Sequence, residues 1–366
     1  MAYTKEEAKR YNRIKIRLKL LDIILTVCYL GLFQAFLSSP LKSYVFGYTS
    51  NFYAAFGVYL TCFMLLGYLV NFPFSFFSGF ILERRFKLSN QSFSAWAVDD
   101  VKKSLLSLVL YFIFIQVLYV FLRNFPTDWW IWIACFWFIT TVVLAKISPA
   151  VIIPLFFKYQ PVDELLKKNV MELSKICGIK ILNVYKIDFS KKTNKMNAAV
   201  VGLGNTRRVL LADNLINNFN QDEINGVLAH EFAHHKMMHM WKMLVFGMVS
   251  IFFSFFMLFV ISSKVVILFN AEGVADMAIF PAFMLVLFLA GFLTMPLHAG
   301  FSRRLERHAD TFALKVTQNK NAFISLMTKL QESNLADPNP SKLIKFLFYD
   351  HPPISERIQS AKDFEA

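Results

Sequence analysis

Residues 230–263 read HEFAHHKMMHMWKMLVFGMVSIFFSFFMLFVISS, a histidine-rich segment that passes directly into a long apolar run. A helix needs about 20 apolar residues to cross a bilayer, and the part from 242 to 263 meets that length. The histidines and glutamate of the polar half indicate a reactive site, and the apolar half indicates a helix in contact with lipid. This stretch therefore places a reactive site beside a membrane surface.

Five more stretches are apolar and long enough to span a membrane, near 18–38, 52–70, 104–122, 129–147 and 278–298. Apolar residues make up 56% of the chain and charged residues only 17%, whereas an ordinary soluble domain has about 25% charged residues. We therefore expect a mostly α-helical, polytopic membrane protein with about six transmembrane helices. A small α+β unit would stand in water.

Basic residues are divided unevenly between the two sides of these spans. The N-terminal segment, the loop after the second span, residues 150–240 and the stretch after the sixth span are rich in lysine and arginine, whereas the opposite loops carry only Lys42, Arg123 and Lys264. The positive-inside rule then puts both termini and residues 150–240 in the cytoplasm. The same bias accounts for the net charge of +14, so no nucleic-acid partner is expected.

Residues 150–240 form the main water-soluble segment, and their pattern predicts a small α+β unit. Residues 163–177 have the periodicity of an amphipathic helix, and 181–188 have the composition of a strand. Residues 197–203 and 208–213 are typical of a β-hairpin, because glycine and asparagine lie between them.

The next helix carries the clearest motif. Asn220, followed three positions later by Glu223, forms a capping box, and from there the sequence reads as one helix through His239 into the fifth span. The HEFAH motif at 230–234 lies on this helix, where positions i and i+4 share a face, so both imidazoles can reach one metal ion. Glu231 is placed to reach a water bound to that metal.

A second pair of histidines has the same spacing. His235 and His239 are four residues apart, but Lys236 stands where the general base would be needed and would repel a metal ion. We expect these two histidines to line the interface or to pack locally.

A catalytic zinc site needs a third protein ligand and an open position. Residues 302–310, SRRLERHAD, follow the sixth span, and the hairpin of the fifth and sixth spans returns the chain to the membrane face of the HEFAH helix. Glu306 is therefore the candidate third ligand. Asp310 shares its helical face and is placed to accept a hydrogen bond from a ligating imidazole.

Further motifs run in order along residues 15–362: ERRF (83–86), NQS (90–92), IPLF (153–156), NA (197–198), HEFAH, SRRLERHAD and HPP (351–353) with Glu356 and Arg357. This ordered set resembles the integral-membrane CAAX prenyl protease family of zinc endopeptidases. The resemblance implies that His230, His234 and Glu306 bind one zinc ion per chain and that Glu231 is the general base.

The resemblance also assigns roles to residues outside the zinc-binding helices. Asn197, Ala198 and Val200 would hold the substrate backbone by strand addition. His351 would steady the oxyanion, although two prolines after it also suit a histidine at a helix start. Arg357 would assist there or brace the C-terminal tail.

The expected function is therefore zinc-dependent hydrolysis of peptide bonds in membrane-associated, CAAX-type polypeptides, with a peptide or lipidated peptide and the bilayer as partners. Eukaryotic family members have seven spans around a water-filled chamber, whereas this chain begins at the equivalent of their second span. The lysine- and phenylalanine-rich composition suggests a bacterial member in the inner membrane. Prenyl specificity does not follow for such a member, because bacteria are not expected to prenylate their own proteins.

Three alternatives remain open. A quality-control membrane metalloprotease without prenyl specificity would have about four spans. A metal-regulated transporter would place polar residues inside the spans, and these are few. A catalytically silent scaffold would not need Glu231. The oligomeric state does not follow from the sequence.

Four regions are expected: transmembrane helices with a cytoplasmic loop (1–150), the metalloprotease segment with hairpin and HEFAH helix (151–240), two further spans (241–300), and a C-terminal helical segment carrying the third ligand (301–366).

Overall fold

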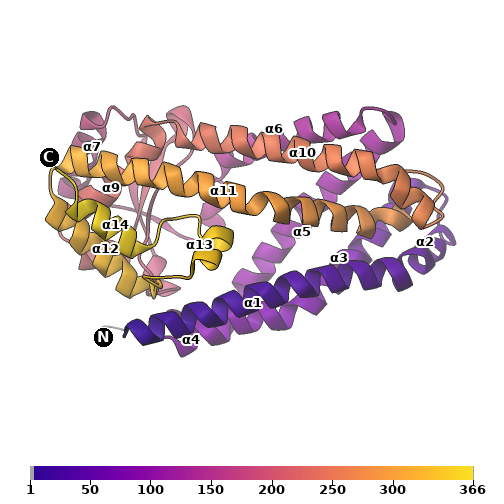
Figure 1. Ribbon diagram of the computed structural model, residues 1–366, viewed down its shortest axis with the longest axis horizontal. Helices are drawn as coiled ribbons and strands as arrows, with labels where there is room; N and C mark the ends of the chain where they lie inside the picture. The colour runs from indigo at the N-terminus through magenta and orange to yellow at the C-terminus, as the bar shows by residue number, and fades with distance from the viewer. Residues whose placement is uncertain (1–3, 366) are drawn as a thin grey trace.

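The computed structural model of the chain describes residues 4–365 and is built mainly of helices (Figure 1). Six helical segments are long and apolar enough to cross a membrane: Lys5–Phe46, Phe52–Arg85, Phe93–Asn124, Trp129–Ile147, His239–Leu268 and Met277–Thr317. These segments contain all the predicted spans. The expected class, a mostly helical polytopic protein with a small sheet domain, is confirmed.

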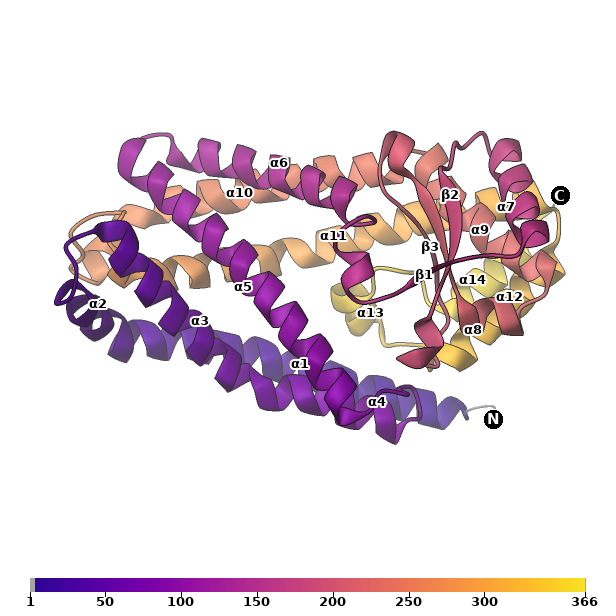
Figure 2. The same cartoon turned by 180° about the vertical axis from the view of Figure 1, so that it is seen from behind.

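The helices are α1 (Lys5–Leu32), α2 (Ser38–Phe46), α3 (Phe52–Phe76), α4 (Leu82–Arg85), α5 (Phe93–Asn124), α6 (Trp129–Ile147), α7 (Glu164–Ile176), α8 (Asp213–Asn218), α9 (Gln221–Lys236), α10 (His239–Leu268), α11 (Phe280–Thr317), α12 (Lys320–Asn334), α13 (Lys342–Phe348) and α14 (Ile354–Lys362). Short π-helical segments join α1 to α2 and α3 to α4. The long helices run along the molecule, and α6 lies beside α10 (Figure 2).

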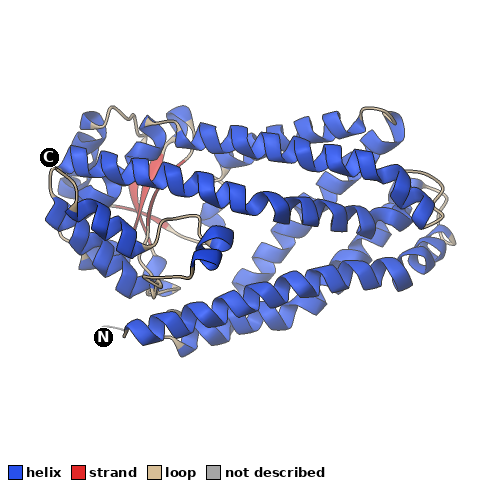
Figure 3. Ribbon diagram, in the orientation of Figure 1, coloured by secondary structure: helices blue, strands red, loops and turns tan. Residues whose placement is uncertain are grey.

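A four-stranded sheet lies at one end of the molecule, the end at which both termini are found (Figures 1 and 3). Its strands, β1 (Tyr159–Pro161), β2 (Asn183–Ile187), β3 (Ala198–Val201) and β4 (Arg208–Ala212), are arranged in the order β1-β2-β4-β3. The predicted strand and hairpin are confirmed, since β3 and β4 pair antiparallel. The sequence did not predict β1, which pairs antiparallel with β2. Strand β3 is an edge strand.

Helix α9 begins where its cap predicts. The Asn220 side chain accepts a hydrogen bond from the Glu223 N–H, and the Glu223 side chain accepts one from the Asn220 N–H. The prediction of one helix through His239 is wrong. Helix α9 ends at Lys236, Met238 takes a left-handed conformation with φ of 56°, and α10 begins at His239. The reason is local, because one left-handed residue interrupts the helical periodicity.

Helix α11 connects the membrane to the sheet end of the protein. It is a single helix of 38 residues from Phe280 to Thr317, so the predicted boundary between 300 and 301 falls inside it. Its apolar first half packs with α10, and its second half packs against α9. One rigid element therefore carries residues of the sixth span directly to the HEFAH helix.

Two of the three hydrophobic clusters among the described residues lie at opposite ends of α11. Buried side chains of the sheet, α7, α9 and α12 form one core at the sheet end. Aromatic residues dominate the second, within the membrane helices, where the ring centroids of Phe56 and Tyr119 lie 4.0 Å apart and Phe280 packs on both. Each core fixes one end of α11, which leaves little freedom for the residues between them.

The turn between β3 and β4 offers a test of this local folding. A Cβ atom at Gly202, where φ is +91°, would lie 2.6 Å from the Thr206 carbonyl oxygen, whereas at Gly204, where φ is +59°, nothing lies within 4 Å. We expect Gly204→Ala to cost about 1 kcal/mol, as a left-handed alanine does. Gly202→Ala should cost roughly 3 kcal/mol, because a clash adds to the strain.

Thermal unfolding of the two purified variants in detergent measures this difference. Equal melting temperatures for Gly202→Ala and Gly204→Ala would show that the turn is not held as described.

Candidate metal centre

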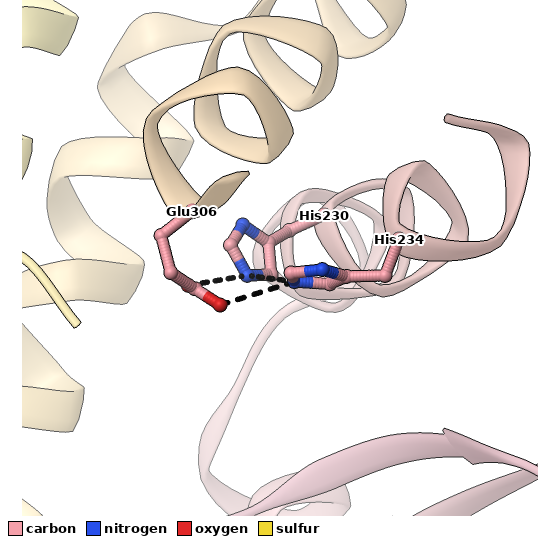
Figure 4. Close-up of side chains that lie close together, drawn as sticks. All are labelled: His230, His234 and Glu306. Carbon is pink, nitrogen blue, oxygen red and sulfur yellow. Dashed lines mark hydrogen bonds and ion pairs between the residues drawn. The ribbon is translucent and has the colours of Figure 1, made fainter. Parts of the chain in front are cut away.

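Three side chains from two helices converge at the sheet end of α11 (Figure 4). His230 and His234 lie one turn apart on α9, with their Nε2 atoms 3.2 Å from each other. Glu306 approaches from α11, with Oε2 at 3.3 Å from the His230 Nε2 and Oε1 at 3.3 Å from the His234 Nε2. One ligand atom from each of the three lies within 4.8 Å of the others.

These residues fit a divalent metal ion. Two imidazole nitrogens and a carboxylate are the donors that zinc prefers, and both His230 and Glu306 are buried. Among the described residues the buried Glu306 Oε2 accepts no hydrogen bond. An uncompensated buried carboxylate oxygen is costly, and a cation between the three side chains would remove that cost.

The two imidazoles differ in their affinity for a proton. Burial, together with the neighbouring His230, lowers the pKa of His234 to about 3, which keeps it in the neutral form that binds metals. Burial also opposes protonation of His230, but the neighbouring carboxylates of Asp310 and Glu306 outweigh it and raise the pKa of His230 to about 9. A metal ion at this position must therefore displace a proton from His230.

Asp310 and Arg357 lie behind His230. The His230 Nδ1 is 2.9 Å from Asp310 Oδ1, and Arg357 on α14 donates from Nε to Asp310 Oδ2 at 2.8 Å. With its Nδ1 side held by Asp310, His230 turns its Nε2 atom towards Glu306 and His234. The structure thus brings together two residues that sequence reasoning placed around the ligands.

His239 lies behind His234, a contact that the sequence interpretation missed. The two Nδ1 atoms are 3.2 Å apart, and His239 is almost fully buried. Five residues along a continuous helix correspond to a rotation of about 140°, which would carry His239 away from His234. The break at Met238 removes that rotation, so the contact could not be read from helical periodicity.

Glu231 is half-buried beside the three ligands. Burial raises the pKa of Glu231, and the neighbouring Glu306 raises it further, whereas His230 and the backbone N–H of Val200 lower it. A carboxylate with a raised pKa is better suited to accept and return a proton near neutral pH.

His351 reaches the centre from the loop between α13 and α14. Its Nε2 lies 3.4 Å from Glu306 Oε1, and its Nδ1 lies 2.9 Å from Asp350. The Asp350 carboxylate raises the pKa of His351. The buried Arg303, one turn before Glu306, donates to the backbone carbonyls of Lys345 and Tyr349 and so anchors the start of this loop. No pattern in the sequence indicates this role for Arg303.

The three residues predicted to bind substrate lie at the edge of the sheet. Ala198 and Val200 belong to β3, and Asn197 comes immediately before it. The Val200 carbonyl lies 3.1 Å from the His235 Nε2 on α9, so the edge strand is linked to the helix that carries the metal ligands. Asn197 lines a cavity of about 640 Å³ together with Lys195, Tyr349 and Asp350.

Comparisons with known proteins agree with this geometry. Residues 162–365 match the model of peptidase family M48, and residues 2–158 match the model of the CAAX prenyl protease N-terminal region, described as five membrane helices. The chain is 31% identical to CAAX prenyl protease 1 of Saccharomyces cerevisiae, over 80% of this chain and 69% of the relative. An uncharacterised metalloprotease of Bacillus subtilis is 28% identical, over 82% and 72%.

The fold is also similar to that of a solved structure. The crystal structure of Saccharomyces mikatae Ste24p superposes with a TM-score of 0.84, covering 98% of this chain and 88% of that chain at 24% sequence identity. The family matches and the apolar helices together make this an integral membrane protein with the metal-dependent catalytic centre of a peptidase.

The contacts behind His230 predict the metal affinity. Asp310→Asn removes the charge that orients the imidazole, so Zn²⁺ should bind about 10- to 100-fold more weakly. Competition with a calibrated chelator measures this affinity, with circular dichroism to verify folding. Asp363→Asn, at an exposed position at the end of α14, is the control and should bind as the parent does. Unchanged affinity in Asp310→Asn would contradict the assigned contact.

Proposed function

Because the chain belongs to peptidase family M48 and is a membrane metalloprotease, we propose that it is a zinc-dependent endopeptidase acting on membrane-associated, CAAX-type polypeptides. The observation that carries the proposal is the convergence of His230, His234 and Glu306 within 4.8 Å, with the half-buried Glu231 beside them. One zinc ion per chain would be held by these three side chains and would supply an acidic water ligand and a Lewis acid for the scissile carbonyl.

The protein's own residues move the proton and stabilise charge. Glu231 takes a proton from the attacking water and returns it to the leaving amine, a role for which its raised pKa is suited. His351, held near Glu306 by the anchored loop, donates a hydrogen bond to the oxyanion. Arg357 positions His230 through Asp310 and also braces α14.

The substrate is an extended peptide lying along β3. An edge strand recognises any peptide backbone by hydrogen bonding, which suits an endopeptidase that tolerates several sequences. The cavity beside Asn197 and Asp350 adjoins this edge at one end and α1 at the other, where Lys15 and Lys19 line it. A water-filled path from the basic face of the membrane helices to β3 would admit the end of a membrane-attached substrate polypeptide.

Prenylated substrates are favoured by the relatives. The matching yeast protein is named as a CAAX prenyl protease, and the fold similarity covers nearly the whole chain. A metalloprotease that cleaves membrane proteins without a prenyl requirement is the alternative that the experiment below distinguishes.

The orientation follows from the charge bias of the loops. The sheet end, where both termini lie (Figure 1), is the basic end, so it faces the cytoplasm. The lysine- and phenylalanine-rich composition supports the inner membrane of a bacterium. The proposed regions are four membrane helices (1–150), the metalloprotease segment (151–240), two more spans (241–300) and a C-terminal helical segment with the third ligand (301–366), and the last boundary lies within the continuous helix α11.

The catalytic proposal is tested by Glu231→Gln. This variant should keep its zinc but lose cleavage of a farnesylated CAAX peptide by a factor of about 10³, because the glutamine cannot accept the proton. Zinc analysis and product release by chromatography measure the two effects.

The same assay with an unfarnesylated peptide decides between the two substrate classes. Slower cleavage without the lipid supports a prenyl protease, and equal rates support the quality-control reading. A Glu231→Gln variant as active as its parent would remove Glu231 from the mechanism.

The orientation is tested with two single cysteines in a background without native cysteines. Thr127→Cys and Asp363→Cys both place the thiol at an exposed position. A membrane-impermeant maleimide should label Thr127→Cys in intact cells and Asp363→Cys only after lysis. The reverse pattern would place the metal centre outside the cytoplasm.

A further inference from the structure

Strand β3 offers few backbone groups to a substrate. In an antiparallel pair, alternate residues direct both backbone groups at the partner strand, and the residues between them direct theirs away. The Asn197 carbonyl accepts a hydrogen bond from the Ala212 N–H at 3.1 Å. Asn197 and Ala199 therefore face β4, and Ala198 and Val200 present their N–H and carbonyl groups at the open edge.

The outward groups of Val200 already have neighbours on α9. The His235 Nε2 lies 3.1 Å from the Val200 carbonyl oxygen, and since a carbonyl only accepts, the hydrogen is on Nε2. The Val200 N–H lies close enough to the Glu231 carboxylate to interact with it. His235 and Glu231 are four residues apart on one helical face, so one face of α9 occupies the edge at Val200.

His235 is a fixed donor at this place. Its side chain is 7% exposed, and its Nε2 hydrogen is committed to the Val200 carbonyl. The hydrogen bond joins the substrate edge to the helix that carries both His230 and Glu231.

We propose that His235 is a positioning residue that limits the pairing edge to Ala198 and thereby fixes the substrate in one register. The N–H and carbonyl of Ala198 are directed at an extended peptide, whereas the Val200 carbonyl is already bonded to His235. One substrate residue then pairs with β3, and Val200, which the sequence resemblance assigned to the substrate backbone, instead defines where pairing stops. Because His235 and Glu231 share α9, the paired residue is held at a constant place relative to the general base. This inference rests on the proposed peptidase function and specifies how that site selects the scissile bond.

Backbone N-methylation tests the register directly, because it removes one amide hydrogen from the peptide. The probes are a farnesylated CAAX peptide and its analogues N-methylated at each residue in turn, bound to Glu231→Gln so that no cleavage occurs. One position should lose affinity by about tenfold, the loss expected for a single backbone hydrogen bond. Sensitivity at two positions two residues apart, or at none, would overturn the proposal.

Matched variants identify His235 as the cause. In the same Glu231→Gln background, His235→Phe keeps an aromatic ring without the donor and frees the Val200 carbonyl, so a second sensitive position should appear two residues from the first. His235→Gln keeps a donor and should retain the single position. A one-position pattern in a folded His235→Phe protein would contradict the proposal.

Two controls separate the possible failures. If His235→Phe does not fold, as judged by its melting temperature, the patterns of the parent and His235→Gln still decide, because both must show one sensitive position. Cleavage of the unmethylated peptide by the wild-type protein reports on the peptidase function independently. A cleaving enzyme with two sensitive positions would keep the function and discard the role of His235.

Discussion

The approach of the Glu306 carboxylate to two imidazoles of α9 is the contact on which the rest of this structure depends. Glu306, His230 and Asp310 are all buried, and buried charges are costly unless they are paired. Arg357 balances Asp310, and Asp310 in turn holds His230. The remaining carboxylate, Glu306, has an oxygen without a hydrogen-bond partner among the described residues, and its charge is balanced most directly by a bound cation.

Helix α11 explains how a membrane protein can build such a site. It carries Arg303, Glu306 and Asp310 on successive turns, and these side chains fix the His351 loop, approach the metal-binding histidines and orient His230. The same helix crosses the bilayer and is fixed at its far end by the aromatic core around Phe280. Because one rigid helix both crosses the membrane and carries the site residues, the position of α11 in the membrane determines how far the site lies from the bilayer.

Much of this arrangement follows from local sequence rules. The spans follow from apolar length, α9 from its capping box, and the return of Glu306 to the level of the histidines from the hairpin of the last two spans. Strand β1 was missed because it has three residues, one of them Pro161, and such a segment carries no alternation. The contacts of His239, His235 and Arg303 were missed because they depend on a break at Met238 and on packing between distant segments, which periodicity does not encode.

The proposed catalytic centre depends on the position of one metal ion between α9 and α11. Anomalous diffraction from crystals of the zinc-loaded protein, recorded on both sides of the zinc absorption edge, locates that ion without reference to activity. We expect one peak per chain, coordinated by the Nε2 atoms of His230 and His234 and by the Glu306 carboxylate at about 2.0–2.2 Å. A peak elsewhere, or no peak in a zinc-saturated crystal, would contradict this assignment.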